Sequence, residues 1–210
     1  MSRKVGAVSE ETRARLLQVA AEEISEVGFQ KASLRKICAK AGVTTGALYF
    51  FFDGKDDLLA NIISPLCAQV MDYVTAHYGP DAHERHQGFF ASEEEDHKAI
   101  EGLYRLLMDN AQVGTIILEN RQHEAVQEFF ERIVACLVQY LESVIEVAYP
   151  EMVESNLNDE YTMRWLAHLQ LDAFLGLFSL GMDEDELWNH VNLVARSFRG
   201  GFTALLLQAS

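Results

Sequence analysis

Apolar residues recur every three to four positions along most of the chain, which is the period of one face of an α-helix. No segment shows the strict alternation of a half-buried strand, so the sequence predicts an all-α fold. The first helix is predicted to begin after Ser9, a good N-cap residue, and to end at Gly28, where glycine accepts a left-handed backbone. Its apolar face is expected to consist of Leu17, Ala20, Ala21 and Ile24.

Two short amphipathic segments follow the first helix. Ser33 is placed to cap one of them and Thr44 to cap the other, whose inner face carries Leu48 and Phe52. Gly42 lies between them, where a glycine lets the chain reverse tightly. This pattern is typical of a helix-turn-helix, in which the second helix faces the major groove of DNA. An ordinary helical hairpin inside a bundle has the same spacing.

Longer helices are predicted beyond residue 54, the first of them with a break near Pro65. Ser92 with Glu95, and Asp183 with Glu186, have the spacing of a capping box at a helix start. The predicted bounds are 55–77, 92–112, 121–148, 159–180 and 184–208.

Charge divides the chain into two parts. The 210 residues include 17 basic and 32 acidic side chains, a net charge of −15. Residues 1–60 hold nine of the basic and eight of the acidic side chains, which leaves 8 and 24 for the rest of the chain. A local basic face can bind phosphates while an acidic remainder is repelled by them. We therefore expect contact with DNA only from the first part.

Other classes of protein find little support in the sequence. No segment approaches the roughly 18 apolar residues of a membrane span, which predicts a cytoplasmic protein without a membrane partner. A Gly-rich phosphate loop, an HExxH motif and a GxSxG motif are all missing, so no catalytic residue and no cofactor is predicted. The cysteines are far apart and odd in number, and three histidines lack ligand spacing; buried free thiols are expected and a metal site is not. These residues are Cys38, Cys67 and Cys136, and His83, His86 and His97.

Residues 42–58, which read GVTTGALYFFFDGKDDL, carry the most specific motif. They closely resemble the signature of the TetR family of transcriptional regulators, G-V-S-x-G-[TA]-L-Y-x-x-F-x-x-K-x-x-L. The preceding residues 28–41, GFQKASLRKICAKA, resemble the family pattern G-[FY]-x-x-[TA]-[ST]-[VLM]-[RD]-x-I-A-x-x-A. The resemblance covers roughly residues 10–60. Beyond residue 60 it rests on length and helix layout.

The resemblance implies a DNA-contacting role for each matching position. Tyr49 and Lys55 match residues that usually contact phosphates, and Ser33 matches a helix-cap hydroxyl that often reaches one. The structural alternatives are that Ser33 and Thr44 serve only as helix caps and that Lys55 is a solvated lysine. The positions that approach bases are Thr44, Thr45, Gly46 and Ala47.

Phe50 and Phe51 depart from the family pattern, which often has a polar residue at these positions. On a helical wheel Phe50 points away from the core, opposite Leu48, whereas Phe51 lies nearer the core. We therefore expect Phe50 to contact an apolar part of DNA, either a thymine methyl group or a deoxyribose. Polar contacts from these two positions are not expected.

The last two predicted helices are apolar over much of their circumference and need cover on more than one side. A buried core helix shows the same pattern. The family resemblance implies instead a four-helix dimer interface formed by the last two helices of each subunit. The candidate interface residues are Trp165, Leu169, Val191, Val194, Phe198 and Phe202.

Taken together, the residues and the resemblance predict a ligand-responsive regulator that binds double-stranded operator DNA as a homodimer. Residues 1–57 would form the DNA-binding domain, and residues 58–210 a helical ligand-binding and dimerisation domain. The resemblance implies repression that a small-molecule inducer relieves, and the acidic, aromatic C-terminal part favours an apolar or cationic inducer. The alternative is a helical ligand- or protein-binding module that has the same fold but little affinity for DNA.

Overall fold

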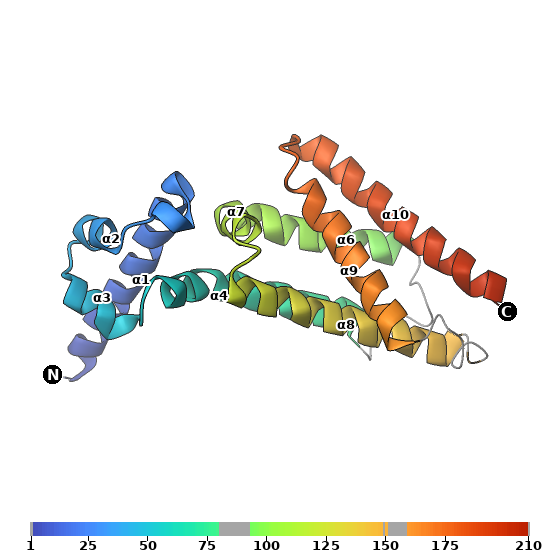
Figure 1. Cartoon of the computed structure of the whole chain (residues 1–210), viewed down its shortest axis with the longest axis horizontal. Helices are drawn as coiled ribbons and strands as arrows, with labels where there is room; N and C mark the ends of the chain where they lie inside the picture. The colour runs from blue at the N-terminus through green and yellow to red at the C-terminus, as the bar shows by residue number, and fades with distance from the viewer. Residues whose placement is uncertain (1, 80–92, 149, 151–158, 210) are drawn as a thin grey trace. The chain divides into compact units, whose positions relative to one another are not determined.

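The computed structural model of the chain describes residues 2–79, 93–148, 150 and 159–209 (Figure 1). Every regular element within these ranges is a helix, which confirms the predicted all-α class. Ser92 of the first predicted capping box, together with His83 and His86, lies outside the described residues. In chain order the elements are α1 (Ser2–Val27), the 3-10 helix η1 (Phe29–Lys31), α2 (Leu34–Ala41), α3 (Thr45–Phe51), α4 (Lys55–Tyr78), α6 (Glu93–Asp109), α7 (Ala111–Glu119), α8 (Glu124–Ala148), α9 (Glu160–Leu177) and α10 (Glu184–Ala209).

The chain divides into two compact units. One comprises residues 1–69 and 110–127, and the other comprises residues 70–109 and 128–210. α4 and α8 each begin in the first unit and continue into the second. The division by function predicted between residues 57 and 58 remains a prediction.

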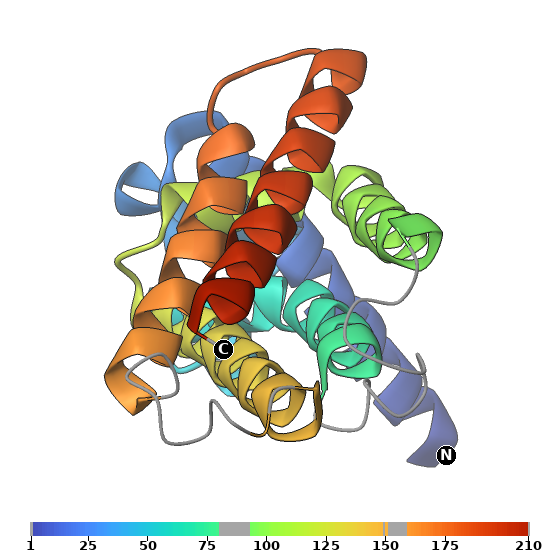
Figure 2. The same cartoon turned by 90° about the vertical axis from the view of Figure 1, so that its right-hand side faces the viewer.

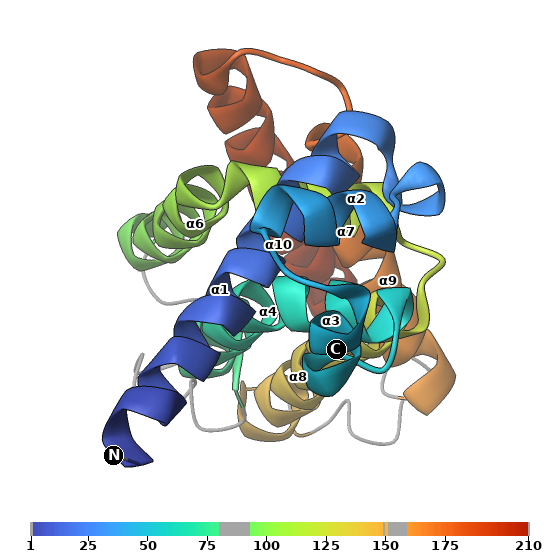
Figure 3. The same cartoon turned by 90° about the vertical axis from the view of Figure 1, so that its left-hand side faces the viewer.

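In the first unit, α2 packs against both α1 and α3 (Figure 3). α1 begins at Ser2 rather than after Ser9, and its fully buried leucine is Leu16, whereas the predicted Leu17 is only half-buried. α7 also packs against α1. The largest fully buried side chains of this unit come from five helices and from Phe52, the residue after α3: Leu16, Ile24, Ile37, Leu48, Phe52, Leu58, Leu59, Ile63 and Ile116.

α4 departs from the sequence prediction in two ways. It remains helical through Pro65, so the predicted break is wrong. It is also long and apolar enough to cross a membrane, judged by length and composition only. The expectation that no segment approaches the length and apolar composition of a membrane span is therefore wrong as well. Half of its most apolar stretch is buried inside the protein, where Leu58, Leu59 and Ile63 pack in the core.

In the second unit, α9 and α10 lie side by side (Figure 2). Tyr104 of α6 joins Leu187 and Val191 of α10 in one buried cluster. A second buried cluster pairs Ile145 of α8 with Met163 of α9. These contacts give the unit its own apolar core.

The starts of two helices are predicted correctly from the sequence, and one short helix is missed. α9 begins after Asp159, whose side chain accepts a hydrogen bond from the Thr162 amide, and Asp183 caps α10 through the Glu186 amide at 2.9 Å. The sequence predicts helices over residues 92–112 and 121–148, whereas α6 ends at Asp109 and the separate helix α7 occupies Ala111–Glu119.

Candidate nucleic-acid interface

The turn between α2 and α3 gives the predicted helix-turn-helix its geometry. Gly42 has a left-handed backbone, with φ of 68°, and ends α2. Its amide donates to Ala39 O at 3.2 Å, and the Val43 amide donates to Cys38 O at 3.0 Å. A side chain at residue 42 would be strained by this positive φ, so glycine is needed for the reversal.

Thr44 caps α3, as predicted. Its backbone is extended, and its hydroxyl oxygen accepts a hydrogen bond from the Ala47 amide at 3.2 Å. Leu48 and Phe52 are fully buried and hold the inner face of α3 in the core. The cap and the buried face together fix which side of α3 meets the solvent.

The outer face of α3 is exposed and partly aromatic. Tyr49 is 59% exposed and Phe50 is 77% exposed, and Thr45 and Gly46 are also exposed. The outward orientation predicted for Phe50 is therefore observed. Its ring packs edge-on against the half-buried Phe51, with ring centroids 5.0 Å apart. Exposed aromatic rings are unusual on a free surface and are common where a protein meets a partner.

Ser33 and Gly46 fit their predicted roles less directly. Ser33 occupies the N-cap position of α2 with an extended backbone, but its hydroxyl makes no capping hydrogen bond. The prediction that its side chain caps the helix is therefore wrong. A Cβ on Gly46 would meet Thr44 Oγ1 at 3.8 Å, an ordinary contact, so the fold itself accepts a larger residue there.

Lys55, at the start of α4, is held against the turn between α1 and α2. Its ammonium nitrogen donates to Phe29 O at 2.9 Å and to Gln30 O at 3.1 Å, and it lies 4.7 Å from the centre of the Phe29 ring. A lysine ammonium carries three N–H donors. These two bonds leave one donor for a further acceptor.

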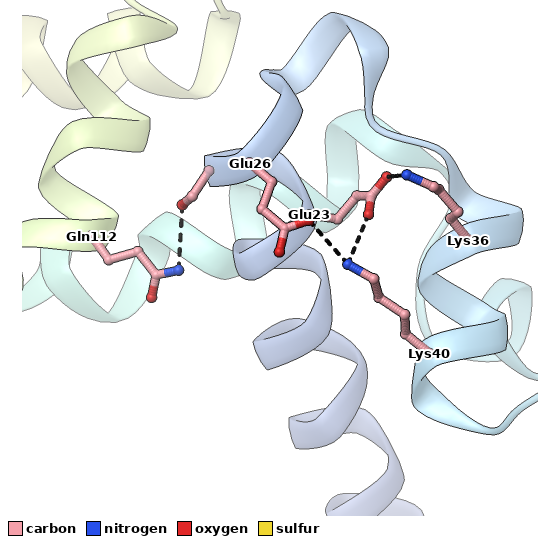
Figure 4. Close-up of polar contacts among 6 residues, drawn as sticks. Glu23, Glu26, Lys36, Lys40 and Gln112 are labelled. Carbon is pink, nitrogen blue, oxygen red and sulfur yellow. Dashed lines mark hydrogen bonds and ion pairs between the residues drawn. The ribbon is translucent and has the colours of Figure 1, made fainter.

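Glu23 of α1 is a buried carboxylate that joins α1 to α2 (Figure 4). Its two oxygens lie 3.2 Å from Lys36 Nζ and 3.1 Å from Lys40 Nζ, and Lys40 also lies 3.2 Å from Glu26. The ammonium of Lys40 lowers the pKa of Glu23, burial opposes this shift, and Lys36 lowers the pKa further. The same pairing raises the pKa of Lys40. Two exposed lysines of α2 are thus tied to α1 through one buried carboxylate.

The predicted dimer residues lie in different surroundings. Trp165 and Leu169 of α9 are 56% and 44% exposed. Val191 is buried in the cluster with Tyr104 inside its own subunit, and Phe202 packs against the cluster of Ile145 and Met163. Val194 and Phe198 are half-buried.

The sequence pattern alone predicts no role for Glu23 or His123. Glu23 stands within the apolar face of α1, and only its pairing with lysines 13 and 17 residues later reveals its function. His123 precedes α8 and pairs with Asp56, 67 residues away. Neither pairing leaves a local pattern in the sequence.

Among the residues that the structure describes, no cluster of histidine, cysteine or acidic side chains has the geometry to hold a metal ion. All three cysteines are buried and free, as predicted.

Comparison with known proteins gives a family match in the same segment. Residues 16–62 match the model of the bacterial regulatory proteins of the tetR family. The HTH-type transcriptional regulator SrpR of Pseudomonas putida is 42% identical over 64 residues, which are 30% of this chain and 30% of SrpR. The chain thus spans less than a third of this relative's length. The HTH-type transcriptional regulator YvdT of Bacillus subtilis is 25% identical over 174 residues, which are 82% of this chain and 84% of YvdT.

A solved structure extends the likeness of the fold to most of the chain. SmeT, the repressor of the Stenotrophomonas maltophilia multidrug efflux pump SmeDEF, superposes with a TM-score of 0.61. The match covers 90% of this chain and 89% of SmeT at 19% sequence identity. At that identity the likeness concerns the fold alone.

The buried Glu23 makes stability depend on pH. Because its pKa is lowered in the folded protein, its ionisation stabilises the fold above the usual carboxyl range, and this contribution is lost as the pH falls through the lowered value. We expect Glu23→Gln to lower the melting temperature by several degrees at pH 7. The difference from wild type should shrink below about pH 4. Thermal unfolding followed by circular dichroism at several pH values measures both effects.

Glu26→Gln provides the matched control, because Glu26 is exposed and shares Lys40. Its effect should be small, as for other exposed ion pairs. Equal effects of the two substitutions would contradict a special role for the buried carboxylate.

Proposed function

The chain belongs to the TetR family of bacterial regulatory proteins, and from this premise we propose that it is a DNA-binding transcriptional regulator. It represses transcription by binding double-stranded operator DNA in the cytoplasm, and a small-molecule inducer releases it. The observation that carries the proposal is the exposed outer face of α3, where Tyr49 and Phe50 stand beside the small residues Gly46 and Ala47.

The residue types on this face fit the major groove. Small side chains at the start of α3 allow close approach, and the Thr45 hydroxyl can donate to or accept from a base edge. Thr44 uses its oxygen to cap the helix and keeps its own proton to donate. Phe50 offers an apolar surface to a thymine methyl or a deoxyribose. Tyr49, Lys55 and Ser33 supply phosphate contacts, which give affinity without choosing the sequence.

The C-terminal part is assigned the inducer-binding role, with an apolar or cationic small molecule as the ligand. An aromatic cluster in the second unit supports this class: Trp188 and Phe178 have ring centroids 5.3 and 6.5 Å from that of Tyr104. Burial, with the negative charge of Glu184, raises the pKa of the Tyr104 phenol. Aromatic faces together with negative charge favour a cation.

The apolar stripe on α9 supports a homodimer. Tyr161, Trp165 and Leu169 recur every four residues and are all exposed, so they share one face of the helix. Stripes of this kind on a free surface mark interfaces. A dimer also supplies two DNA-binding domains, one for each half-site of a two-fold symmetric operator. The interface is built on this stripe, while Val191 serves the core of its own subunit.

Substitution of Phe50 tests whether the exposed outer face of α3 contacts DNA. We expect Phe50→Ala to weaken binding to the DNA upstream of the protein's own gene, measured by gel mobility shift, with little change in melting temperature. Phe50→Arg should raise non-specific affinity and steepen its salt dependence, because arginine adds a phosphate contact. Phe51→Ala is the control and should chiefly lower the melting temperature, since Phe51 is half-buried. If Phe50→Ala bound DNA normally but had a much lower melting temperature, Phe50 would be a core residue and would not belong to the DNA-contacting face of α3. No binding by the wild type would favour a helical ligand- or protein-binding module.

Lys55 is expected to contribute one ionic phosphate contact. Lys55→Met keeps most of the side-chain stem and removes the charge, so the slope of log affinity against log salt should fall by roughly one unit. Arg105→Met removes one positive charge from an exposed residue of α6 and should leave the slope unchanged. An unchanged slope for Lys55→Met would show that Lys55 contacts no phosphate and has only a structural role, through its contacts with Phe29 and Gln30. Binding titrations at several salt concentrations measure the slope.

A charge on the α9 stripe should separate the subunits. We expect Trp165→Glu to give a folded monomer by sedimentation equilibrium, because Trp165 is exposed within one chain and its replacement disturbs no core. Gln127→Glu adds the same charge at an exposed position of α8 and should leave the dimer intact. A wild-type monomer at micromolar concentration would contradict the dimer itself.

A further inference from the structure

His123 contacts two other segments of the first unit. It immediately precedes α8, and its side chain is 14% exposed. Its Nε2 atom lies 3.1 Å from Asp56 Oδ1 in the first turn of α4. Its ring meets Phe29 of η1 edge-on, with centroids 5.4 Å apart and planes at 87°. One ring thus joins the start of α8 to the start of α4 and to the turn after α1.

The hydrogen bonds of the ring specify its tautomer. The Ala125 amide donates to His123 Nδ1 at 3.3 Å, so in the neutral imidazole the proton resides on Nε2 and is donated to Asp56. The main-chain oxygen of His123 accepts from the amides of Val126 and Gln127, both at 3.0 Å. His123 is therefore the N-cap of α8. Capping alone needs neither Asp56 nor Phe29.

Phe29 connects His123 to Lys55. The Phe29 ring receives the edge contact of His123 and the ammonium of Lys55, and its carbonyl accepts one of the Lys55 hydrogen bonds. The position of the Lys55 ammonium therefore depends on the position of Phe29. His123 acts on Phe29 directly, and on the first turn of α4 through Asp56.

We propose that His123 is a positioning residue for the DNA contact of Lys55 and that it links this contact to the start of α8. The proposal rests on the function proposed above. His123 touches no phosphate; it fixes the turn whose carbonyls hold Lys55. The same side chain thus sets the orientation of the first turn of α8 and the placement of Lys55. α8 itself continues into the second unit.

His123→Asn tests the proposal, because asparagine is a strong N-cap residue and can still cap α8 but lacks the ring that meets Phe29 and the reach to Asp56. In the DNA-free protein we expect faster hydrogen exchange at the Lys31 and Ala32 amides, which both donate to Gly28 O within the turn. Operator affinity should fall about tenfold and the salt slope by up to about one unit, as for Lys55→Met, because the displaced Lys55 ammonium loses its phosphate contact. His190→Asn is the control, because His190 is exposed on α10 and bonds to Glu186 O within its own helix.

Asp56→Ala should accelerate the same two amides, which keeps the test valid if His123→Asn does not fold. Unchanged exchange in a folded His123→Asn would overturn the proposal, because capping would then be the whole role of His123. In the Lys55→Met background, His123→Asn should lower the slope no further; an additional fall would also overturn the proposal, since His123 would then contact a phosphate itself. If the wild type binds no operator, the proposed function fails while the exchange result still decides the positioning role.

Discussion

The burial of Phe29 sets the geometry of the first unit. The chain must leave α1, bury this ring at 6% exposure and start α2 within a few residues. Gly28 allows the exit with a φ of 79°, and its carbonyl accepts from the amides of Lys31 and Ala32. Lys55 then places its charge on the ring and two of its donors on the carbonyls of the same turn. A residue proposed to contact DNA is therefore part of the fold before any DNA is bound.

The features that the sequence predicted well are those governed by neighbouring residues. The left-handed Gly42 and the cap at Thr44 depend on the backbone within one turn. The burial of Leu48 and the exposure of Phe50 follow from the helical period. The family motif adds roles to these positions, because its residues are contiguous in sequence. The local prediction failed at Ser33, whose backbone has the capping geometry without the hydrogen bond.

The features that the sequence did not predict depend on pairs of distant residues. A periodic pattern marks Val191 as apolar, but it cannot decide between the core of one subunit and an interface. Charge counting treats Lys36 and Lys40 as free to bind phosphates, whereas both lysines pair with the buried carboxylate of Glu23. Pro65 is a further case, because the surroundings of α4 maintain a helix that local propensity would end.

The two helices that pass from one unit to the other begin at one place. Lys55 and Asp56 open α4, and His123 caps α8 while binding Asp56. The starts of both helices therefore share the contacts around Phe29. A change in either helix that altered its first turn would act on the same ring and the same carbonyls. For a regulator, such a shared anchor allows changes in either helix to affect the residue proposed to contact DNA, without requiring that α3, the proposed recognition helix, itself be deformed.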